Sequence, residues 1–247
     1  MKHEALWRNA MAYLDDKQTE MCLLLKNLVN IETPSTDKEA VSRLAGHLDT
    51  YCNAMGLTCR KERYDAAGDA LTARTAPGTQ RPVALLGHLD TVHPVGSWPE
   101  TLRQEGDRLY GPGAYDCKGG VVIALFAVKA LLACGYKERQ LRLALSSDEE
   151  SAHMLSRGLG GRLFTQECEG CAAAFNCESG SLANEAVIER KGGAVIDIQV
   201  RGVSAHAGRD PEKGASAIRA AARLVERLES LTDRNGNLFN CGKSKAA

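Results

Sequence analysis

Short β-prone runs alternate with helical stretches along most of the chain, and this alternation limits its possible folds more than any other feature. The β-prone runs are 57–64, 68–74, 82–88, 107–110 and 141–146. Apolar residues recur at helical spacing over 4–30, 37–55 and 118–134. Strands that alternate with helices indicate an α/β fold, a mostly parallel sheet with helices on both faces. In such sheets, ligands bind beyond the carboxyl ends of the strands.

The character of the sequence changes near residue 192. Residues 187–200 read as two strands around Lys191-Gly192-Gly193, and the second alternates apolar and polar residues like a one-sided antiparallel strand. A helix follows over about 212–231. We therefore predict a first domain of residues 1–191 and part of a smaller α+β domain over 192–247. One strand and one helix cannot bury a two-layer core, so the second domain is expected to be incomplete.

Composition excludes several classes of partner. Lysine plus arginine equals aspartate plus glutamate at 31 each, so no net charge attracts nucleic acid or an anionic membrane. The most apolar stretch, Gly120 to Cys134, is too short to span a bilayer and carries Lys129, so it predicts a core helix. The N-terminus lacks the uninterrupted apolar segment of a signal peptide. We expect a cytoplasmic protein that acts on a small molecule.

Nine cysteines, an odd number, indicate free thiols in a reducing compartment. Cys168 and Cys171 form a CxxC pattern with Cys177 nearby, which could be half of a structural zinc site. A second CxxC or CxxH is missing, so free, partly buried thiols remain the favoured interpretation.

Four groups of acidic or imidazole side chains each follow a predicted strand. They are His88 with Asp90, Asp116, Asp148 with Glu149 and Glu150, and Glu178. Taken singly, a histidine is more often a surface or hydrogen-bonded residue, and a carboxylate after a strand is often a helix cap. The carboxyl ends of parallel strands meet at one edge of the sheet, however. One histidine and several carboxylates at that edge suit Zn²⁺.

The spacing within these groups predicts separate roles. Residues i and i+2 of an extended chain point to the same side, so Asp90 can accept the second N–H of His88. The turn at 111–113, glycine-proline-glycine, allows close approach of the backbone and places Asp116 where it can bridge two ions. The adjacent Glu149 and Glu150 can diverge, so that one binds metal and the other serves as a general base.

Four motifs carry a resemblance to a known family. GHLDTV, GPGAYDCKGG, SSDEES and SAHAGRDPEKGASAI occur in order between about residues 80 and 220. They resemble those of the zinc-dependent exopeptidases and amidohydrolases, which include glutamate carboxypeptidase, aminoacylase, acetylornithine deacetylase and succinyl-diaminopimelate desuccinylase. The glycine-proline-glycine turn most resembles the glutamate carboxypeptidase branch. The resemblance implies a metal-dependent hydrolase that cleaves a terminal peptide bond or an N-acyl amide bond.

The resemblance also implies roles for individual residues. His88, Asp116 and Glu178 would bind one zinc ion, and Asp116 and Glu150 would reach a second. Asp90 would orient His88, and Glu149 would be the base.

In that family the smaller domain is a lid through which two subunits form a homodimer. Residues 1–191 would be the N-terminal part of the metal-binding domain, and 192–247 the first half of the lid. His206 would reach the carbonyl region of a small peptide or N-acyl amino acid in the partner's site. Without the resemblance, His206 reads as a helix cap or a solvent-exposed residue.

The chain also departs from the family pattern. The second zinc of the family takes a further histidine from beyond the lid, and residue 247 precedes that position, so a C-terminally truncated member with an incomplete second site is expected. Ser179 follows Glu178 where relatives often have proline. The rival interpretation is a catalytically inactive remnant that binds at most one zinc. His93 and His153 are predicted to be structural or exposed.

Overall fold

The computed structural model describes residues 2–180, 183, 185–188 and 197–231. The chain divides into two compact units, Met1–Ala186 and Val187–Ala247. The predicted domain boundary between residues 191 and 192 lies outside the described residues.

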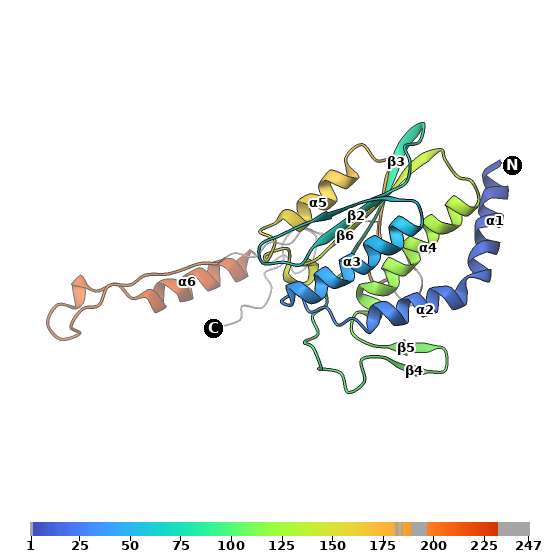
Figure 1. Cartoon of the computed structure of the whole chain (residues 1–247). Helices are drawn as coiled ribbons and strands as arrows, with labels where there is room; N and C mark the ends of the chain where they lie inside the picture. The colour runs from blue at the N-terminus through green and yellow to red at the C-terminus, as the bar shows by residue number, and fades with distance from the viewer. Residues whose placement is uncertain (1, 181–182, 184, 189–196, 232–247) are drawn as a thin grey trace. The chain divides into compact units, whose positions relative to one another are not determined.

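A five-stranded sheet forms the centre of the first unit (Figure 1). Its strands lie in the order β1 (Thr58–Glu62), β2 (Ala70–Arg74), β6 (Arg139–Ser146), β3 (Gln80–His88) and β7 (Ala173–Asn176). β3 pairs in parallel with both β6 and β7, whereas β2 is antiparallel to β1 and β6. Four of the five strands therefore run in one direction. The sheet is mixed and mostly parallel, as predicted.

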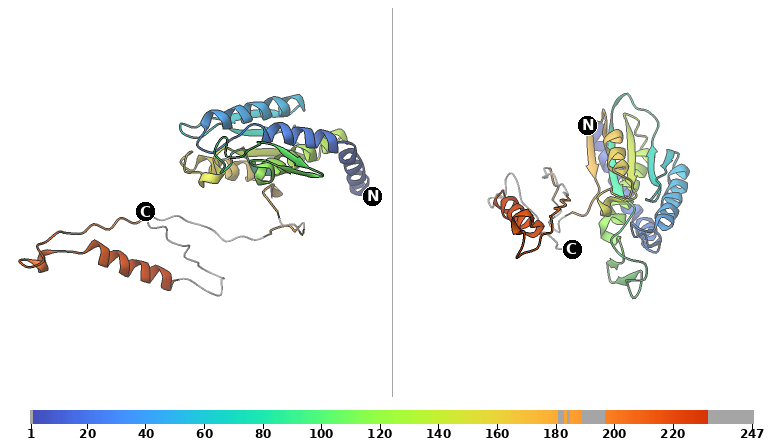
Figure 2. Two further views of the ribbon diagram at one scale, coloured as in Figure 1. Left: turned by 90° about the horizontal axis from the view of Figure 1, so that it is seen from below. Right: turned by 90° about the vertical axis from the view of Figure 1, so that its left-hand side faces the viewer.

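Helices cover both faces of this sheet (Figures 1 and 2). One face carries α2 (Gln18–Val29), α3 (Lys38–Ala54) and α4 (Gly119–Ala133), with α1 (Lys2–Asp16) against α4, and the other carries α5 (Leu159–Cys168). Alternate residues of β2 face the two layers, because successive side chains of a strand point to opposite sides. Leu71 belongs to the core cluster with α3 and α4, and Ala70 packs with Leu163 of α5. The predicted α/β class is thus confirmed.

The predicted core helix is α4. Val121, Leu125, Phe126 and Val128 are all buried in the main core. A helix this rich in apolar residues is typical of a protein interior, and here Ile123 is an exception, at 61% exposed. Among the described residues, none of the helices combines the length and apolarity needed to cross a membrane.

Several elements differ from the prediction. The helical stretch 4–30 forms two helices that meet at Lys17. The run 107–110 forms β5 (Arg108–Tyr110), which pairs with β4 (Arg103–Glu105) in a separate hairpin instead of joining the main sheet. The helix α5 was not predicted, because its LGGRLFTQEC segment contains two glycines with low helix propensity. Burial of Leu163 stabilises α5 in the folded chain.

In the second unit, α6 (Ala217–Ser230) begins where the Ser216 hydroxyl accepts the backbone N–H of Arg219. The described part of the predicted second strand, 197–200, does not pair as a strand, and the rest of it lies outside the described residues. The apolar side chains of this helix are not buried within the described residues, and Ile218 is 83% exposed. This exposure agrees with the expectation that one strand and one helix do not bury a core.

A pair of leucines in α2 tests the position of the core. Leu28 is fully buried and Leu23 is 58% exposed on the same helix. We expect Leu28→Ala to lower the free energy of unfolding by about 2–5 kcal/mol, because it leaves a cavity in the main core. Leu23→Ala should change it by less than about 0.5 kcal/mol. Urea unfolding followed by circular dichroism measures both, and equal losses would contradict this packing.

Candidate metal centre

The polar residues singled out in the sequence come together at one edge of the sheet. Because β3, β6 and β7 are parallel, their carboxyl ends meet there. Three loops and one strand end carry the residues, namely His88 at the end of β3, Asp116 in the short segment η1 (Ala114–Lys118), Glu149 and Glu150 in η2 (Glu149–Ser151), and Glu178 after β7.

His88 lies at the centre of this group. Its Nε2 atom is 3.0 Å from Oδ1 of Asp116 and 3.5 Å from Oε2 of Glu178. Potential ligand atoms of His88, Asp116, Cys117 and Glu178 all lie within 4.8 Å of one another. The structure therefore brings together the three residues that the sequence nominates for one zinc ion. Metal binding by them remains a prediction.

Asp90 connects His88 to the loop after β6. Nδ1 of His88 lies 3.0 Å from the backbone oxygen of Asp90 and 3.4 Å from its Oδ1. The Asp90 carboxylate accepts the backbone N–H groups of Glu149 and Glu150, each at 3.1 Å, and the Ser35 hydroxyl at 2.6 Å. From the sequence, we predicted only that the Asp90 carboxylate would accept the N–H of the His88 ring. In the structure the backbone oxygen makes the shorter contact, and the carboxylate holds η2 as well.

The local environment shifts the pKa values of the acids. Burial raises the pKa of Glu149, and the nearby carboxylates of Glu178 and Asp90 add to the rise, while His88 opposes it. Burial likewise raises the pKa of Glu150, with Asp116 adding to the effect. The hydrogen bond from His88 lowers the pKa of Glu178 despite burial. A carboxylate with a raised pKa is a stronger proton acceptor near neutral pH.

His88 itself is wholly buried among these acids. Burial would lower its pKa, but hydrogen bonds with Asp90, Cys117 and Glu178 outweigh burial and raise the pKa well above the usual value. Positive charge is thus favoured at this position, whether on the imidazole or on a cation bound beside it.

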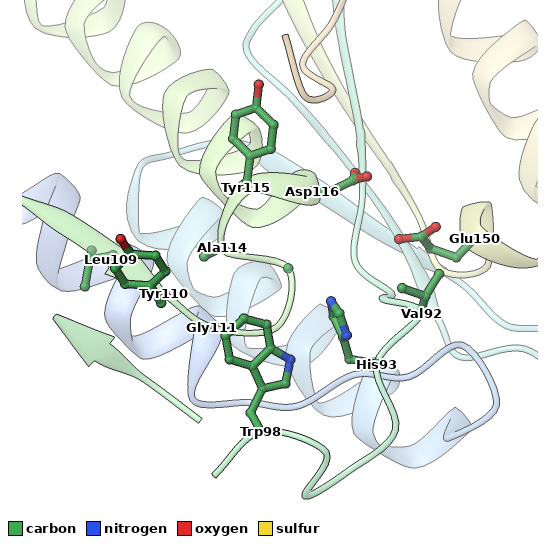
Figure 3. Close-up of a pocket in the computed structure, with 11 residues that line it drawn as sticks. Val92, His93, Trp98, Leu109, Tyr110, Gly111, Ala114, Tyr115, Asp116 and Glu150 are labelled. Atoms are coloured by element: carbon green, nitrogen blue, oxygen red, sulfur yellow. The ribbon is translucent and has the colours of Figure 1, made fainter. Parts of the chain in front are cut away.

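A pocket opens beside these carboxylates (Figure 3). Its volume is about 330 Å³, and Asp116 and Glu150 form part of its lining. Figure 3 shows the Glu150 carboxylate directed toward Asp116. The two residues nominated for a second metal ion therefore share one wall of the pocket.

Sequence reasoning missed several residues of the site. Cys117 is buried, and its Sγ accepts the backbone N–H of His88 at 3.0 Å. Lys118 is also buried and donates to the backbone oxygen of Ile31 at 2.8 Å, and burial lowers its pKa to about 8. His93 is half-buried in the pocket, in edge-to-face contact with Trp98 at 5.5 Å between ring centroids. The sequence signal for Cys117 and Lys118 was their place inside the GPGAYDCKGG motif, and for His93 only its position directly after GHLDTV.

Other nominated residues lie elsewhere. His206 is exposed in the second unit, where its Nδ1 accepts the backbone N–H of Gly208 at 3.1 Å. Its contact with substrate remains a prediction. The described cysteines are all free. Within the described ranges, Cys168, Cys171 and Cys177 do not gather a group of metal-binding side chains, and the thiol of Cys171 instead donates to the backbone oxygen of Glu167.

Known proteins are similar to this chain in sequence and in fold. The profile of Peptidase family M20/M25/M40 matches residues 84–238. Carboxypeptidase G2 of Pseudomonas sp. is 29% identical over 94% of this chain and 56% of its own length. Acetylornithine deacetylase of Myxococcus xanthus is 31% identical over 76% of this chain and 49% of its own length. The chain thus spans about half the length of the curated relatives it matches.

Solved structures show the same fold at low sequence identity. Human carnosine dipeptidase 1 superposes with a TM-score of 0.59 at 19% identity, over 68% of this chain and 40% of that one. A tripeptidase of Staphylococcus aureus gives a TM-score of 0.58 at 18% identity, over 84% and 55%. The family profile covers more than half of the chain, and its region contains the strand ends that carry the acidic cluster. The chain belongs to Peptidase family M20/M25/M40.

Proposed function

We propose that this protein is a metal-dependent hydrolase that cleaves a terminal peptide bond or an N-acyl amide bond. Family membership supports metallohydrolase chemistry, and carboxypeptidase G2 and acetylornithine deacetylase are named for reactions of these two kinds. The observation that carries the proposal is the convergence of Asp116 and Glu178 on Nε2 of His88.

The donor atoms of the cluster fit zinc. One imidazole nitrogen and several carboxylate oxygens are ligands that Zn²⁺ accepts, and the site lies beside a pocket that a substrate can enter. We propose that His88, Asp116 and Glu178 hold one ion and that Asp116 and Glu150 contribute to a second. Bound zinc supplies a Lewis acid that polarises the scissile carbonyl and makes a water molecule more acidic.

The remaining chemistry belongs to side chains of this chain. Glu149 is the proposed general base, which takes a proton from the attacking water and gives it to the leaving amine. Its raised pKa suits this exchange near neutral pH. Asp90 is the proposed positioning residue, because it contacts the His88 ring and the backbone N–H of Glu149 together. We further propose that His206 of the lid contacts the substrate carbonyl and that the complete protein is a homodimer.

Zinc should stabilise the folded chain. The metal binds carboxylates that otherwise repel one another, so chelator-treated protein should gain about 2.7 kcal/mol in free energy of unfolding at free Zn²⁺ 100-fold above its Kd. Glu178→Gln should lose most of this gain. Glu169→Gln is the matched control, because Glu169 is exposed and lies outside the cluster. Thermal unfolding with and without Zn²⁺ measures the effect, and equal gains in all three proteins would rule out this site.

Substituting the two adjacent glutamates one at a time tests which of them is the base and which is a metal ligand. We expect Glu149→Gln to keep its zinc content and to lower kcat for N-acyl amino acids by about 100- to 10,000-fold, because it removes a proton acceptor. Glu150→Gln should instead lower the zinc content. Metal analysis and amine release measure the two properties. Hydrolysis by Glu149→Gln at the unmutated rate would show that another group is the base.

The same assays decide between the enzyme and the inactive remnant. About two zinc ions per chain, together with hydrolysis of glutamyl or acetyl substrates, support the enzyme. One ion or none, without turnover, supports the remnant.

A further inference from the structure

The pocket beside the acidic cluster has an aromatic wall that the reaction proposed above does not use. We call the whole pocket the aromatic pocket. Its aromatic and apolar wall consists of Val92, His93, Trp98, Leu109, Tyr110 and Tyr115. These residues come from the segment after β3, the end of the β4–β5 hairpin and η1. Figure 3 shows Trp98 and His93 on one side of the hollow, Tyr110 on another, and Asp116 and Glu150 on the rim opposite Trp98.

The size and lining of the aromatic pocket suit a small apolar group. Its volume of about 330 Å³ lies at the lower end of the ~300–1,000 Å³ that is usual for small-molecule sites. Trp98 and His93 are half-buried and meet edge to face, which holds the indole ring in place. Aromatic side chains fixed in this way offer large contact areas to rings and branched aliphatic groups.

The charges around the pocket disfavour an anionic group. Among the described residues that line it, the charged side chains are Asp116 and Glu150, and neither lysine nor arginine is present. Arg103 stacks on the Tyr110 ring, 4.6 Å from its centroid, but it already pairs with Glu105. A carboxylate in the pocket would therefore have no lysine or arginine partner among these lining residues, and the cations proposed beside Asp116 and Glu150 are already paired with those two carboxylates. Burying an unpaired charge of this kind is costly.

The position of the pocket connects it to the substrate. Asp116 and Glu150 belong both to its wall and to the proposed metal centre, so a group inside it lies next to the bond that reacts. We propose that the aromatic pocket binds the substituent adjacent to the scissile amide and that this substituent is uncharged, either an aromatic ring or a branched aliphatic chain. The location of the bond rests on the proposed function, whereas the class of substituent rests on the pocket itself.

Binding can be measured without turnover because the chain has two tryptophans, Trp7 and Trp98. Trp7 is 64% exposed in α1, so Trp7→Phe leaves Trp98 as the single reporter inside the pocket. The zinc-loaded full chain that carries Trp7→Phe together with Glu149→Gln, so that the compounds are not consumed, is titrated with two matched pairs of compounds while Trp98 emission is followed. N-acetyl-phenylalanine and N-acetyl-glutamate vary the amine side, and N-benzoyl-glycine and N-succinyl-glycine vary the acyl side.

In each pair, we call the compound with the second carboxylate, on its side chain or acyl group, the anionic member. We expect the aromatic member of at least one pair to bind about 10-fold or more tightly than the anionic member. Val92→Lys places a cation in the lining and should reduce that ratio at least threefold by improving binding of the anion. Val95→Lys is the matched control, because Val95 is exposed on the same loop but does not line this pocket. It should leave the ratio unchanged. Circular dichroism checks that both variants fold.

Three outcomes would overturn the inference. The first is equal or tighter binding of the anionic member in both pairs. The second is no change in Trp98 emission with any compound. The third is an equal effect of Val92→Lys and Val95→Lys. Failure of the proposed function has a different signature, since it shows as missing zinc binding and missing hydrolysis of all four compounds by the unmutated chain, whatever their order of binding to the pocket.

Discussion

The site depends on the hydrogen bonds that the buried carboxylate of Asp90 accepts. The carboxylate is fully enclosed and accepts hydrogen bonds from Ser35 before α3 and from the backbone of Glu149 and Glu150 after β6. Its own backbone oxygen contacts the ring of His88. A buried carboxylate is tolerated only where such donors satisfy it. The same bonds therefore stabilise the loop junction and fix the distance between the imidazole and the two glutamates.

The sheet brings the loops of the site together, and the hydrogen bonds of Asp90 then hold their side chains in place. Parallel pairing of β3 with β6 and β7 places three loops at one edge, and the turn before η1 brings Asp116 to the same place. Gly113 is needed in that turn, because its φ is +72° and a Cβ atom would lie 2.6 Å from Cγ2 of Thr91. The Tyr115 hydroxyl then donates to the backbone oxygen of Gly180, which connects η1 to the loop that carries Glu178.

One concentration of negative charge has several consequences. It adds to burial in raising the pKa values of Glu149 and Glu150, and it favours a cation beside His88. In our proposal, the carboxylates of Asp116 and Glu150 beside the aromatic pocket affect both which metal ion and which substrate group can bind. Attraction of opposite charge selects the metal, and the cost of an unpaired charge selects the substituent.

Local patterns in the sequence determined the elements with long apolar runs, such as α4 and β6, and the motifs whose family resemblance nominated His88, Asp116 and Glu178. Those features depend on neighbours in the chain, so they can be read from the letters alone. Only the tertiary structure decided the rest: the helix α5, the separate β4–β5 hairpin, the buried Cys117 and the pocket around Trp98. The β4–β5 hairpin is local, but the run 107–110 does not show by itself which strand it pairs with. The burial of α5 and of Cys117 and the pocket result from contacts between segments far apart in the sequence, and neither periodicity nor spacing records such contacts.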